Sequence, residues 1–371
     1  MGEVRAADCS KVAIITGGLG FIGTHLIEEI KDEYDLIVVV DNLSPTVHKA
    51  APNTSNLGIL LIDGDVQDPG TWERVDKVLP NKSYILSIFH LAADTSTANS
   101  LKHPSSHVST NILGTSTLCE FLNSKIQNVC RVVLTSTRAV YGEGRWQTPT
   151  GEVINPEPRT QTDLKARCWT PKYLNQFCIT PHPTSSLLQT PSPVNIYGST
   201  KLSQENILQI WCKAHDIELR IFRLQNVYGP GQSLWNSYSG VISLFVRKSL
   251  LGETIEVYEG GGIIRDLVFV KDVVKILGSE FDTSKDNSII DVGSGIPVTL
   301  LEVATKISQK CGSPNPMITN NFRIGDVRSV FADNSRLLQS NYISEFTSLE
   351  AGISALVDWA RIEIESEGEF K

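Results

Sequence analysis

The sequence has no long hydrophobic run and no surplus of positive charge. No apolar stretch approaches the roughly 20 residues that a membrane-spanning helix needs. The formal net charge is −8, whereas a nucleic-acid-binding surface requires a concentrated basic patch. The amino-terminal segment also lacks the apolar core of a secretory signal. We therefore expect a cytoplasmic protein that binds neither membranes nor nucleic acid.

Paired cysteines are missing as well. The chain has 7 cysteines, an odd number, and none of them forms a CxxC pair. A disulfide framework usually has an even number of cysteines, and a structural zinc site usually has CxxC pairs, so we expect reduced thiols and no metal site. Cys168 and Cys178 share one proline-rich segment, and a joint role for these two residues stays open.

Strand-like and helix-like segments alternate along the first 225 residues. The apolar runs 11–16 and 36–41 are typical of central parallel strands that are covered on both faces. Residues 21–30 between them have the apolar spacing of a helix. The alternation predicts an α/β protein with a doubly wound parallel (Rossmann) sheet. Further strands are expected at 58–66, 87–93, 131–137 and 218–224, and further helices at 71–79, 109–124 and 197–214.

A proline-rich segment interrupts the alternation between residues 143 and 192. It has no sustained period and far exceeds the usual loop length of about 4–6 residues. We expect it to be an insertion that either forms a lid or rim over a binding pocket or decorates the surface.

The pattern changes again at residue 226. A turn-rich loop is followed by expected helices at 240–252 and 348–365, by expected strands at 254–259 and 265–270, and by a capping-box pattern at Thr299 and Glu302. We therefore expect a dinucleotide-binding domain at 1–225 and a smaller α/β lobe at 226–371. That lobe is built from non-contiguous segments, with about 263–295 returning to the first domain.

A glycine-rich turn follows the first expected strand. Gly17, Gly20 and Gly23 have the spacing GxxGxxG and open the helix 21–30. Glycine lets the backbone approach a pyrophosphate, which the N–H groups at a helix amino terminus can bind. Asp41 ends the next strand, where its carboxylate can accept both ribose hydroxyls of NAD and opposes the 2′-phosphate of NADP. The pattern predicts an NAD site.

Other polar residues follow strands at the same edge of the sheet, where such folds bind ligands. Asp65 and Val66 come after the third expected strand and either contact adenine or form a simple turn. Thr137 ends the strand 131–137, and its hydroxyl either bonds a substrate oxygen or caps the next segment.

Tyr197 and Lys201 are four residues apart on an expected helix. Residues at i and i+4 share a helix face, so the ammonium can lie near the phenol. A phenol with a pKa near ~10 is a poor base at neutral pH, and a neighbouring cation favours the phenolate. This spacing occurs by chance in many helices, and only its combination with the glycine-rich turn indicates proton transfer.

The motifs TGGLGFIG, DNL, GDV, HLAA, LTSTRAVYG and YGSTK occur in this order. With them the chain resembles the extended short-chain dehydrogenase/reductase family that acts on nucleotide sugars. The segments RLQNVYGPGQSL, RDLVFVKDVV and RIGDVRSVFAD are most similar to those of the dTDP-L-rhamnose 4-epimerases, which have a similar insertion. The resemblance runs from about Lys11 to the last helix. It implies NAD-dependent C4 epimerisation of a nucleotide-linked 6-deoxyhexose (dTDP-L-rhamnose to dTDP-6-deoxy-L-talose) through a transient 4-keto sugar, by a homodimer.

The resemblance also implies individual roles. Thr137, Tyr197 and Lys201 would be catalytic. Asn226, Arg265 and Arg328 would hold the nucleotide diphosphate, which agrees with the preference of guanidinium groups for phosphate oxygens. The residues expected to contact NAD are Gly17, Gly20, Phe21, Ile22, Gly23, Asp41, Asn42, Asp65, Val66, Leu91, Ala92, Ala93, Tyr197 and Lys201.

Two positions depart from related patterns. Related dehydratases have Asp-Glu directly after the threonine, and this chain has Arg138-Ala139 instead, so the acid and base for removing water are missing. Ser237 stands where the rhamnose epimerases usually have proline. The alternatives are a UDP-hexose 4-epimerase, a decarboxylase, a 4-keto reductase that uses NADPH (which Asp41 opposes), or a non-catalytic NAD-binding sensor or scaffold.

Overall fold

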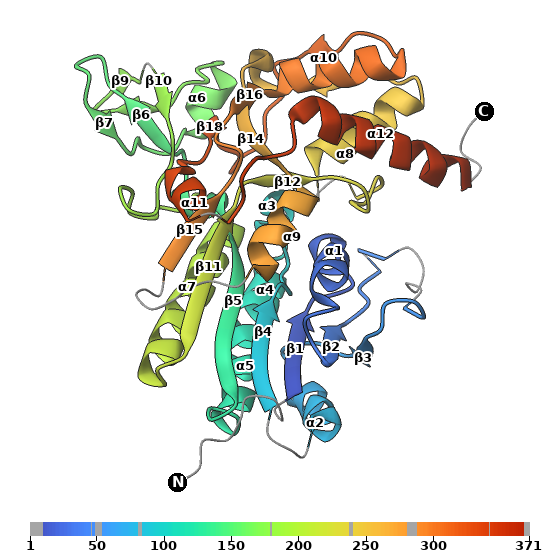
Figure 1. Ribbon diagram of the computed structural model, residues 1–371. Coiled ribbons are helices and arrows are strands. Elements are labelled where there is room, and N and C mark those ends of the chain that lie inside the picture. Colours follow the sequence, from blue (N-terminus) through green and yellow to red (C-terminus); the bar gives the residue numbers. More distant parts are fainter. Residues whose placement is uncertain are drawn as a thin grey trace.

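The computed structural model describes residues 10–45, 47–48, 54–80, 84–178, 180–236, 240–279, 288–340 and 342–366. Ser237 and the amino-terminal segment lie outside these residues. The apolar runs form a seven-stranded sheet in the order β3-β2-β1-β4-β5-β11-β15, and every neighbouring pair is parallel (Figure 1). This confirms the predicted doubly wound α/β fold. The strands are β1 (Ser10–Thr16), β2 (Leu36–Asp41), β3 (Leu60–Asp63), β4 (Tyr84–His90), β5 (Val129–Thr137), β11 (Glu218–Leu224) and β15 (Ser288–Val292).

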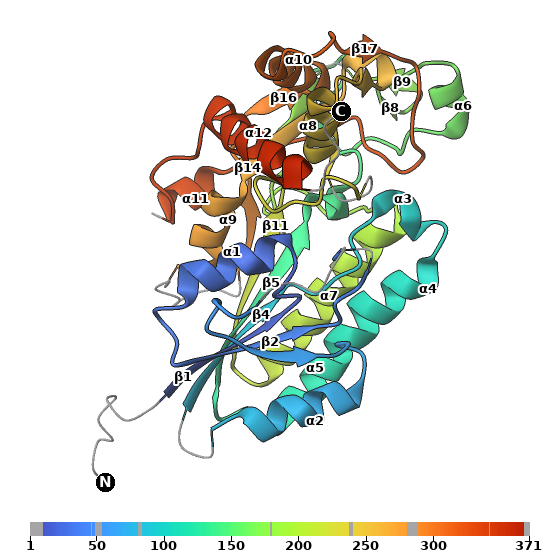
Figure 2. The ribbon, with the colours of Figure 1, turned by 90° about the vertical axis from the view of Figure 1, so that its right-hand side faces the viewer.

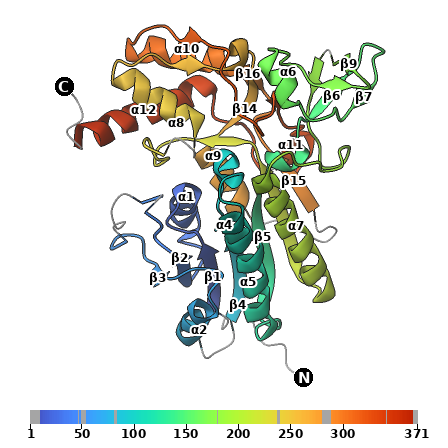
Figure 3. The same ribbon diagram turned by 180° about the vertical axis from the view of Figure 1, so that it is seen from behind.

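Helices cover both faces of this sheet because its strands are apolar on both sides. Successive side chains of a strand point to opposite faces, so Ile14 and Ile15 of β1 belong to two different buried cores. One face carries α1 (Phe21–Ile30) and α9 (Val270–Gly278), as Figure 2 shows. The other carries α2 (Pro69–Val78), α5 (Gly114–Asn123) and α7 (Ile196–Ala214), and Figure 3 shows α5 and α7 side by side.

A smaller lobe lies above the carboxyl ends of the large sheet (Figure 1). Its core is a small sheet in which β14 pairs with β12, β16 and β18. Thr299 caps one of its helices by accepting a hydrogen bond from the Glu302 N–H at 3.1 Å. Its elements are β12 (Asn226–Tyr228), β14 (Ile264–Phe269), β16 (Pro297–Thr299), β18 (Ser329–Val330), the pair β13 (Glu256–Val257) and β17 (Met317–Ile318), α8 (Val241–Leu250), α10 (Leu300–Cys311) and α12 (Leu349–Ser366). The short helix α11 (Ser335–Gln339) instead packs against β15 of the large sheet.

The chain returns to the large sheet after entering the smaller lobe. β15 pairs with β11, and α9 packs against α1 so closely that a Cβ on Gly278 would lie 2.9 Å from the Ile30 side chain. The division into residues 1–225 and 226–371, with about 263–295 returning, stays our proposal. It is supported by these pairings, although 280–287 lie outside the described residues.

The proline-rich insertion has more regular structure than its sequence predicts. Its strands are very short, which explains why no period is visible in the sequence. β10 (Thr180–His182), β6 (Arg145–Gln147) and β7 (Val153–Ile154) form an antiparallel sheet; β8 (Lys172–Tyr173) pairs with β9 (Gln176–Phe177), and α6 (Gln161–Lys165) has a capping box.

Two further properties concern the described residues as a whole. Cys168 and Cys178 are free thiols, as are the four other cysteines that the structure describes. Within the described ranges, none of the helices is long and apolar enough to cross a membrane.

Candidate active site

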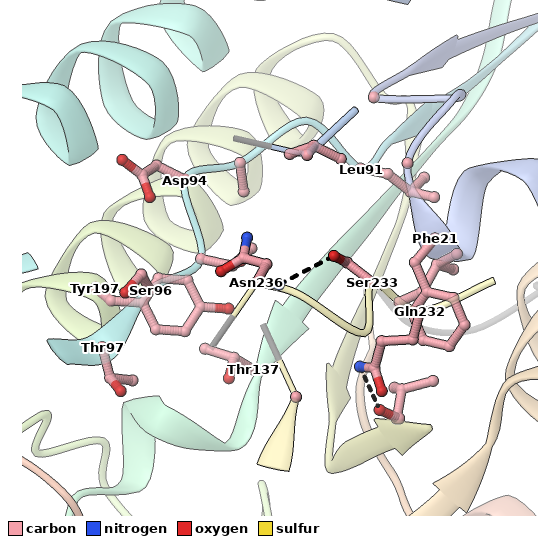
Figure 4. A pocket seen from close by; sticks show the side chains of 18 of the residues that line it. Phe21, Leu91, Asp94, Ser96, Thr97, Thr137, Tyr197, Gln232, Ser233 and Asn236 are labelled. Atoms are coloured by element: carbon pink, nitrogen blue, oxygen red, sulfur yellow. Dashed lines mark hydrogen bonds between the residues drawn. The ribbon is translucent and has the colours of Figure 1, made fainter. Parts of the chain in front are cut away.

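One large cleft lies between the carboxyl ends of β1, β4 and β5 and the smaller lobe (Figure 4). Its volume is about 2120 Å³, well above the ~300–1,000 Å³ of a typical single-ligand pocket, so a dinucleotide and a second ligand both fit. All but one of the residues implicated by the sequence line it. They are Gly17, Gly20, Phe21, Ile22, Gly23, Asp41, Asn42, Asp65, Val66, Leu91, Ala92, Ala93, Thr137, Tyr197, Lys201, Asn226 and Arg265.

The glycine-rich turn makes a tight cradle at the floor of this cleft. Gly17 has φ +66°, and a Cβ there would lie 2.9 Å from the Ala92 backbone. A Cβ on Gly23 would lie 2.6 Å from the Gly17 carbonyl oxygen, so α1 packs directly on the turn. Gly20 precedes α1 and gives it no side-chain cap, which leaves the first N–H groups available to an anion. These features fit the pyrophosphate of NAD.

Asp41 is placed to meet a ribose. Its two carboxylate oxygens accept hydrogen bonds from the Leu19 and Leu43 N–H groups, each at 3.0 Å. Asn42 donates to Asp65 at 3.0 Å, so the ends of β2 and β3 are joined beside the cleft. An acidic side chain at this position suits the ribose diol of NAD and repels a 2′-phosphate.

Tyr197 and Thr137 meet on one side of the cleft, opposite Phe21 and Leu91 (Figure 4). The Tyr197 phenol and the Thr137 side chain lie close together there, and both line the cleft. Their backbones are held together because Gly198 packs on Ala139, where an added Cβ would lie 2.6 Å from the Ala139 oxygen. Burial raises the pKa of Tyr197, while the neighbouring Thr137 side chain and the Arg138 charge act in the opposite direction.

Lys201 lies deeper in the same wall and is almost fully buried. Burial lowers its pKa to about 7, and the Glu205 carboxylate acts in the opposite direction. The cation whose charge lowers the pKa of Tyr197 is Arg138. The expected support of the Tyr197 phenolate by Lys201 therefore stays a prediction.

Arg138 is a cleft residue whose role the sequence reasoning missed. Its Nε donates to the Asn226 side-chain oxygen at 2.8 Å, and burial, together with the Arg265 charge, lowers its pKa to about 9. The sequence signal was its position directly after Thr137, which we interpreted only as the loss of a dehydratase acid.

The two other predicted arginines differ in position. Arg265 lines the cleft, is buried, and donates through Nη1 to the backbone oxygens of Ile264 (2.7 Å) and Arg328 (3.4 Å). Arg328 is the one predicted site residue that does not line the cleft. Its Nη1 instead donates to the backbone oxygen of Glu259 at 2.9 Å and to a Glu259 carboxylate oxygen at 3.3 Å.

A buried histidine joins the floor of the cleft to its wall. His90 at the end of β4 contacts the Thr16 hydroxyl at 2.7 Å through Nδ1 and the Thr115 hydroxyl at 2.9 Å through Nε2. Gln204 of α7 donates to Thr115 at 2.7 Å. Burial, and secondarily the Lys201 charge, lowers the pKa of His90 to about 3. The motif HLAA contains this residue, but its network of hydroxyl groups comes from distant segments.

The lowered pKa of His90 predicts that the free energy of unfolding depends on pH. Its pKa in the folded chain is about 3, and its ordinary value is 6.5. Between these values the unfolded chain binds a proton that the folded chain does not. His90 therefore lowers the free energy of unfolding by up to about 1.4 kcal/mol per pH unit as the pH falls from 6.5. Denaturant unfolding at pH 7, 6 and 5 should give a shallower pH dependence for His90→Gln than for the unmodified chain.

The exposed His103 provides the matched control. We expect His103→Gln to keep the pH dependence of the unmodified chain. Equal slopes for all three proteins would contradict the assignment of a neutral, buried His90.

Metal-binding groups do not cluster at the cleft or elsewhere in the described ranges. No three His, Cys, Asp or Glu side chains there lie close enough together to hold an ion.

Comparison with known proteins identifies the family. Residues 13–163 and 175–293 match the NAD dependent epimerase/dehydratase family. The dTDP-L-rhamnose 4-epimerase of Burkholderia thailandensis is 36% identical over 98% of this chain and 99% of its own. The UDP-glucose 4-epimerase of Thermotoga maritima, solved with UDP-glucose, superposes with a TM-score of 0.75 at 26% identity over 95% of this chain and 99% of its own.

A third relative was solved with a cofactor. MoeE5 in complex with UDP-glucuronic acid and NAD superposes with a TM-score of 0.72 at 26% identity, over 95% of this chain and 99% of its own. These similarities confirm the resemblance that the sequence motifs carry. The chain belongs to the NAD-dependent epimerase/dehydratase family, among the nucleotide-sugar epimerases of the extended short-chain dehydrogenases/reductases, and its cofactor is NAD.

Proposed function

We propose that this chain epimerises a nucleotide-activated 6-deoxyhexose at C4, converting dTDP-L-rhamnose and dTDP-6-deoxy-L-talose into each other. The dTDP-L-rhamnose 4-epimerase of Burkholderia thailandensis is similar to this chain over nearly the full length of both proteins, so the match spans the insertion as well. Within the cleft, the observation that carries the proposal is the Tyr197–Thr137 pair, which lines the same space as the glycine-rich cradle and Arg265.

The proposed mechanism assigns Tyr197 to the proton at O4. As a phenolate it takes the proton of the C4 hydroxyl, and it returns that proton when the 4-keto sugar is reduced. Thr137 shares the hydrogen bond to O4, and Lys201 and Arg138 supply positive charge near the phenolate. Bound NAD, held by the glycine-rich cradle and Asp41, would accept a hydride from C4 and give it back to the opposite face of the keto sugar.

Epimerisation requires that the keto sugar turn over between the two half-reactions. The anchor must therefore be the nucleotide diphosphate rather than the sugar hydroxyls. We propose Asn226, Arg265 and Arg328 for this clamp. Asn226 and Arg265 line the cleft, and the backbone oxygen of Arg328 accepts a hydrogen bond from Arg265.

Incubation with dTDP-L-rhamnose without any added reductant tests the proposal. We expect NMR to detect the C4 epimer at equilibrium, with no net consumption of NAD. UDP-glucose and UDP-glucuronic acid serve as comparison substrates. Epimerisation of UDP-glucose in preference to dTDP-L-rhamnose would favour a UDP-hexose 4-epimerase, which the structural similarity to the Thermotoga maritima enzyme also supports.

We also propose that the active form is a cytoplasmic homodimer that pairs through α5, α7 and the π-helical turn Val108–Leu113. Ile210 on α7 is 72% exposed, and Val108 and Leu113 are 44% and 50% exposed on the neighbouring segment. Such neighbouring exposed apolar side chains favour a self-complementary interface. Leu208 instead belongs to the core against the sheet, with Ile207 and Trp211 packed on it.

Ile210→Glu is expected to turn the dimer into a monomer. Two-fold symmetry would bury the new carboxylate in both copies, and an unpaired buried charge is costly. Light scattering after size-exclusion chromatography measures the mass. Ile362→Glu on α12, where the isoleucine is 67% exposed, is the matched control and should leave the mass unchanged. A dimer that persists in Ile210→Glu would contradict this interface.

A further inference from the structure

The insertion contributes one deeply buried arginine to the base of the smaller lobe. The side chain of Arg159 is only 2% exposed and pairs with two carboxylates. Its Nε lies 2.8 Å from Glu143, and its Nη1 lies 2.6 Å from Glu259. Glu143 and Glu259 are themselves 3% and 1% exposed. Burying such a network costs desolvation free energy, so stability alone does not explain it. It points instead to a role in positioning neighbouring residues.

The same arginine holds the loop that carries Arg328. Arg159 donates through Nη2 to the Asp326 backbone oxygen at 2.7 Å. Glu143, its other partner, accepts a hydrogen bond from the Arg328 N–H at 3.0 Å. The backbone on both sides of Val327 is therefore fixed from the insertion.

Glu259 connects Arg159 to the guanidinium of Arg328. One Glu259 carboxylate oxygen accepts hydrogen bonds from Arg159 Nη1 at 2.6 Å and from Arg328 Nη1 at 3.3 Å. The other carboxylate oxygen has no hydrogen-bond partner among the described residues. Glu259 also has φ +51°, a left-handed conformation that non-glycine residues rarely adopt. Strained backbone of this kind persists only where its surroundings force it, and it gathers at functional sites.

We propose that Arg159 is a positioning residue of the diphosphate clamp: by pairing with Glu143 and Glu259, it fixes the Arg328 loop and leaves the Arg328 guanidinium available to phosphate. This inference rests on the proposed function, because it assigns Arg328 to the nucleotide diphosphate. It also gives the insertion a role that differs from the expected lid or rim. None of its described residues between 143 and 192 lines the cleft.

Charge balance explains why phosphate binding by Arg328 would depend on Arg159. The group contains two guanidinium groups, Arg159 and Arg328, and two carboxylates, Glu143 and Glu259. Without Arg159, both carboxylates would face only Arg328 and Arg265. They would hold the Arg328 guanidinium more firmly and add negative charge behind a site that has to bind a dianion.

Arg159→Met tests the proposal, with dTDP binding measured by calorimetry on the NAD-loaded protein. We expect the Kd for dTDP and the KM for the sugar nucleotide to rise at least about tenfold, while kcat at saturation and the NAD content stay within twofold. Adding Glu259→Gln restores the charge balance but not the bond to the Asp326 backbone oxygen, so the double variant should recover part of the affinity. Lys172→Met, which breaks a surface ion pair in the same insertion, is the control and should bind dTDP normally.

If Arg159→Met does not fold, Arg159→Lys is the variant that tests the proposal. Lysine keeps the charge but cannot span two carboxylates and a backbone oxygen, so we expect a smaller loss of dTDP affinity with the same kcat. Gly262→Ala is an independent probe. Its new Cβ would lie 2.1 Å from Arg328 Nη2, at the movable end of a side chain, and Gly262 has an ordinary φ of −96°. It should weaken dTDP binding without loss of the fold.

Each outcome decides one of the two proposals. An Arg159 variant that folds and binds dTDP as tightly as the unmodified chain overturns the positioning role, as does a double variant with no recovery. If the unmodified chain binds neither dTDP nor UDP, the proposed function fails instead.

Discussion

Tyr197→Phe is expected to stop epimerisation while NAD remains bound. The substitution removes only the phenolic oxygen, which lies beside Thr137 in the cleft. Proton transfer by a positioned side chain typically contributes about 10²–10⁴ to a rate, so turnover should fall by roughly a thousandfold. The measurements are NMR detection of the epimer and the NAD content of the purified variant.

Tyr173→Phe is the matched control for this substitution. It removes the same hydroxyl from a tyrosine of the insertion that lies outside the cleft, and it should leave turnover unchanged. Activity of Tyr197→Phe close to that of the unmodified chain would remove Tyr197 from the mechanism.

Gly23→Ala should prevent NAD from binding and destabilise the chain. The added methyl group would lie 2.6 Å from the Gly17 oxygen and from the Gly18 backbone, and these rigid backbone atoms cannot rotate away. α1 would then have to move off the glycine-rich turn, which we propose as the pyrophosphate cradle. Overpacking of this kind costs about 1–3 kcal/mol of the free energy of unfolding. Chromatography of the nucleotide released on denaturation measures bound NAD, and thermal unfolding measures stability.

Gly70→Ala shows what a glycine substitution does without a collision. The nearest atom to its new Cβ would be a side-chain oxygen of Asp68 at 3.4 Å, in the first turn of α2. Alanine suits a helix better than glycine, so this variant should keep NAD and be equally or slightly more stable. A Gly23→Ala protein with full NAD content would contradict the proposed cradle.

The parts of the fold that were predicted well are those with strong local signals. The helix 21–30 and the strands 36–41 and 218–224 begin and end as predicted. Each is a continuous apolar or periodic run bounded by glycine or by polar residues. The strand expected at 58–66 is only Leu60–Asp63, because Gly64 already leaves the sheet and Asp65 belongs to the turn that meets Asn42.

The parts that were missed depend on contacts between distant residues. The short strands of the insertion are stabilised by their partners, so their sequence shows no period. Arg159 and Glu259 are separated by 100 positions, and nothing near either residue signals a buried ion pair. Arg138 was visible in the sequence, but its bond to Asn226 required the fold.

The route of the chain between the two lobes has a consequence for fragments and chimaeras. A polypeptide ending at Leu224 would lack the edge strand β15 and the helix α9, and it would leave the apolar faces of β11 and α1 uncovered. The first 224 residues are therefore not expected to fold as an independent unit. Grafting it onto another scaffold would require residues 270–278 and 288–292 to be transplanted together with it.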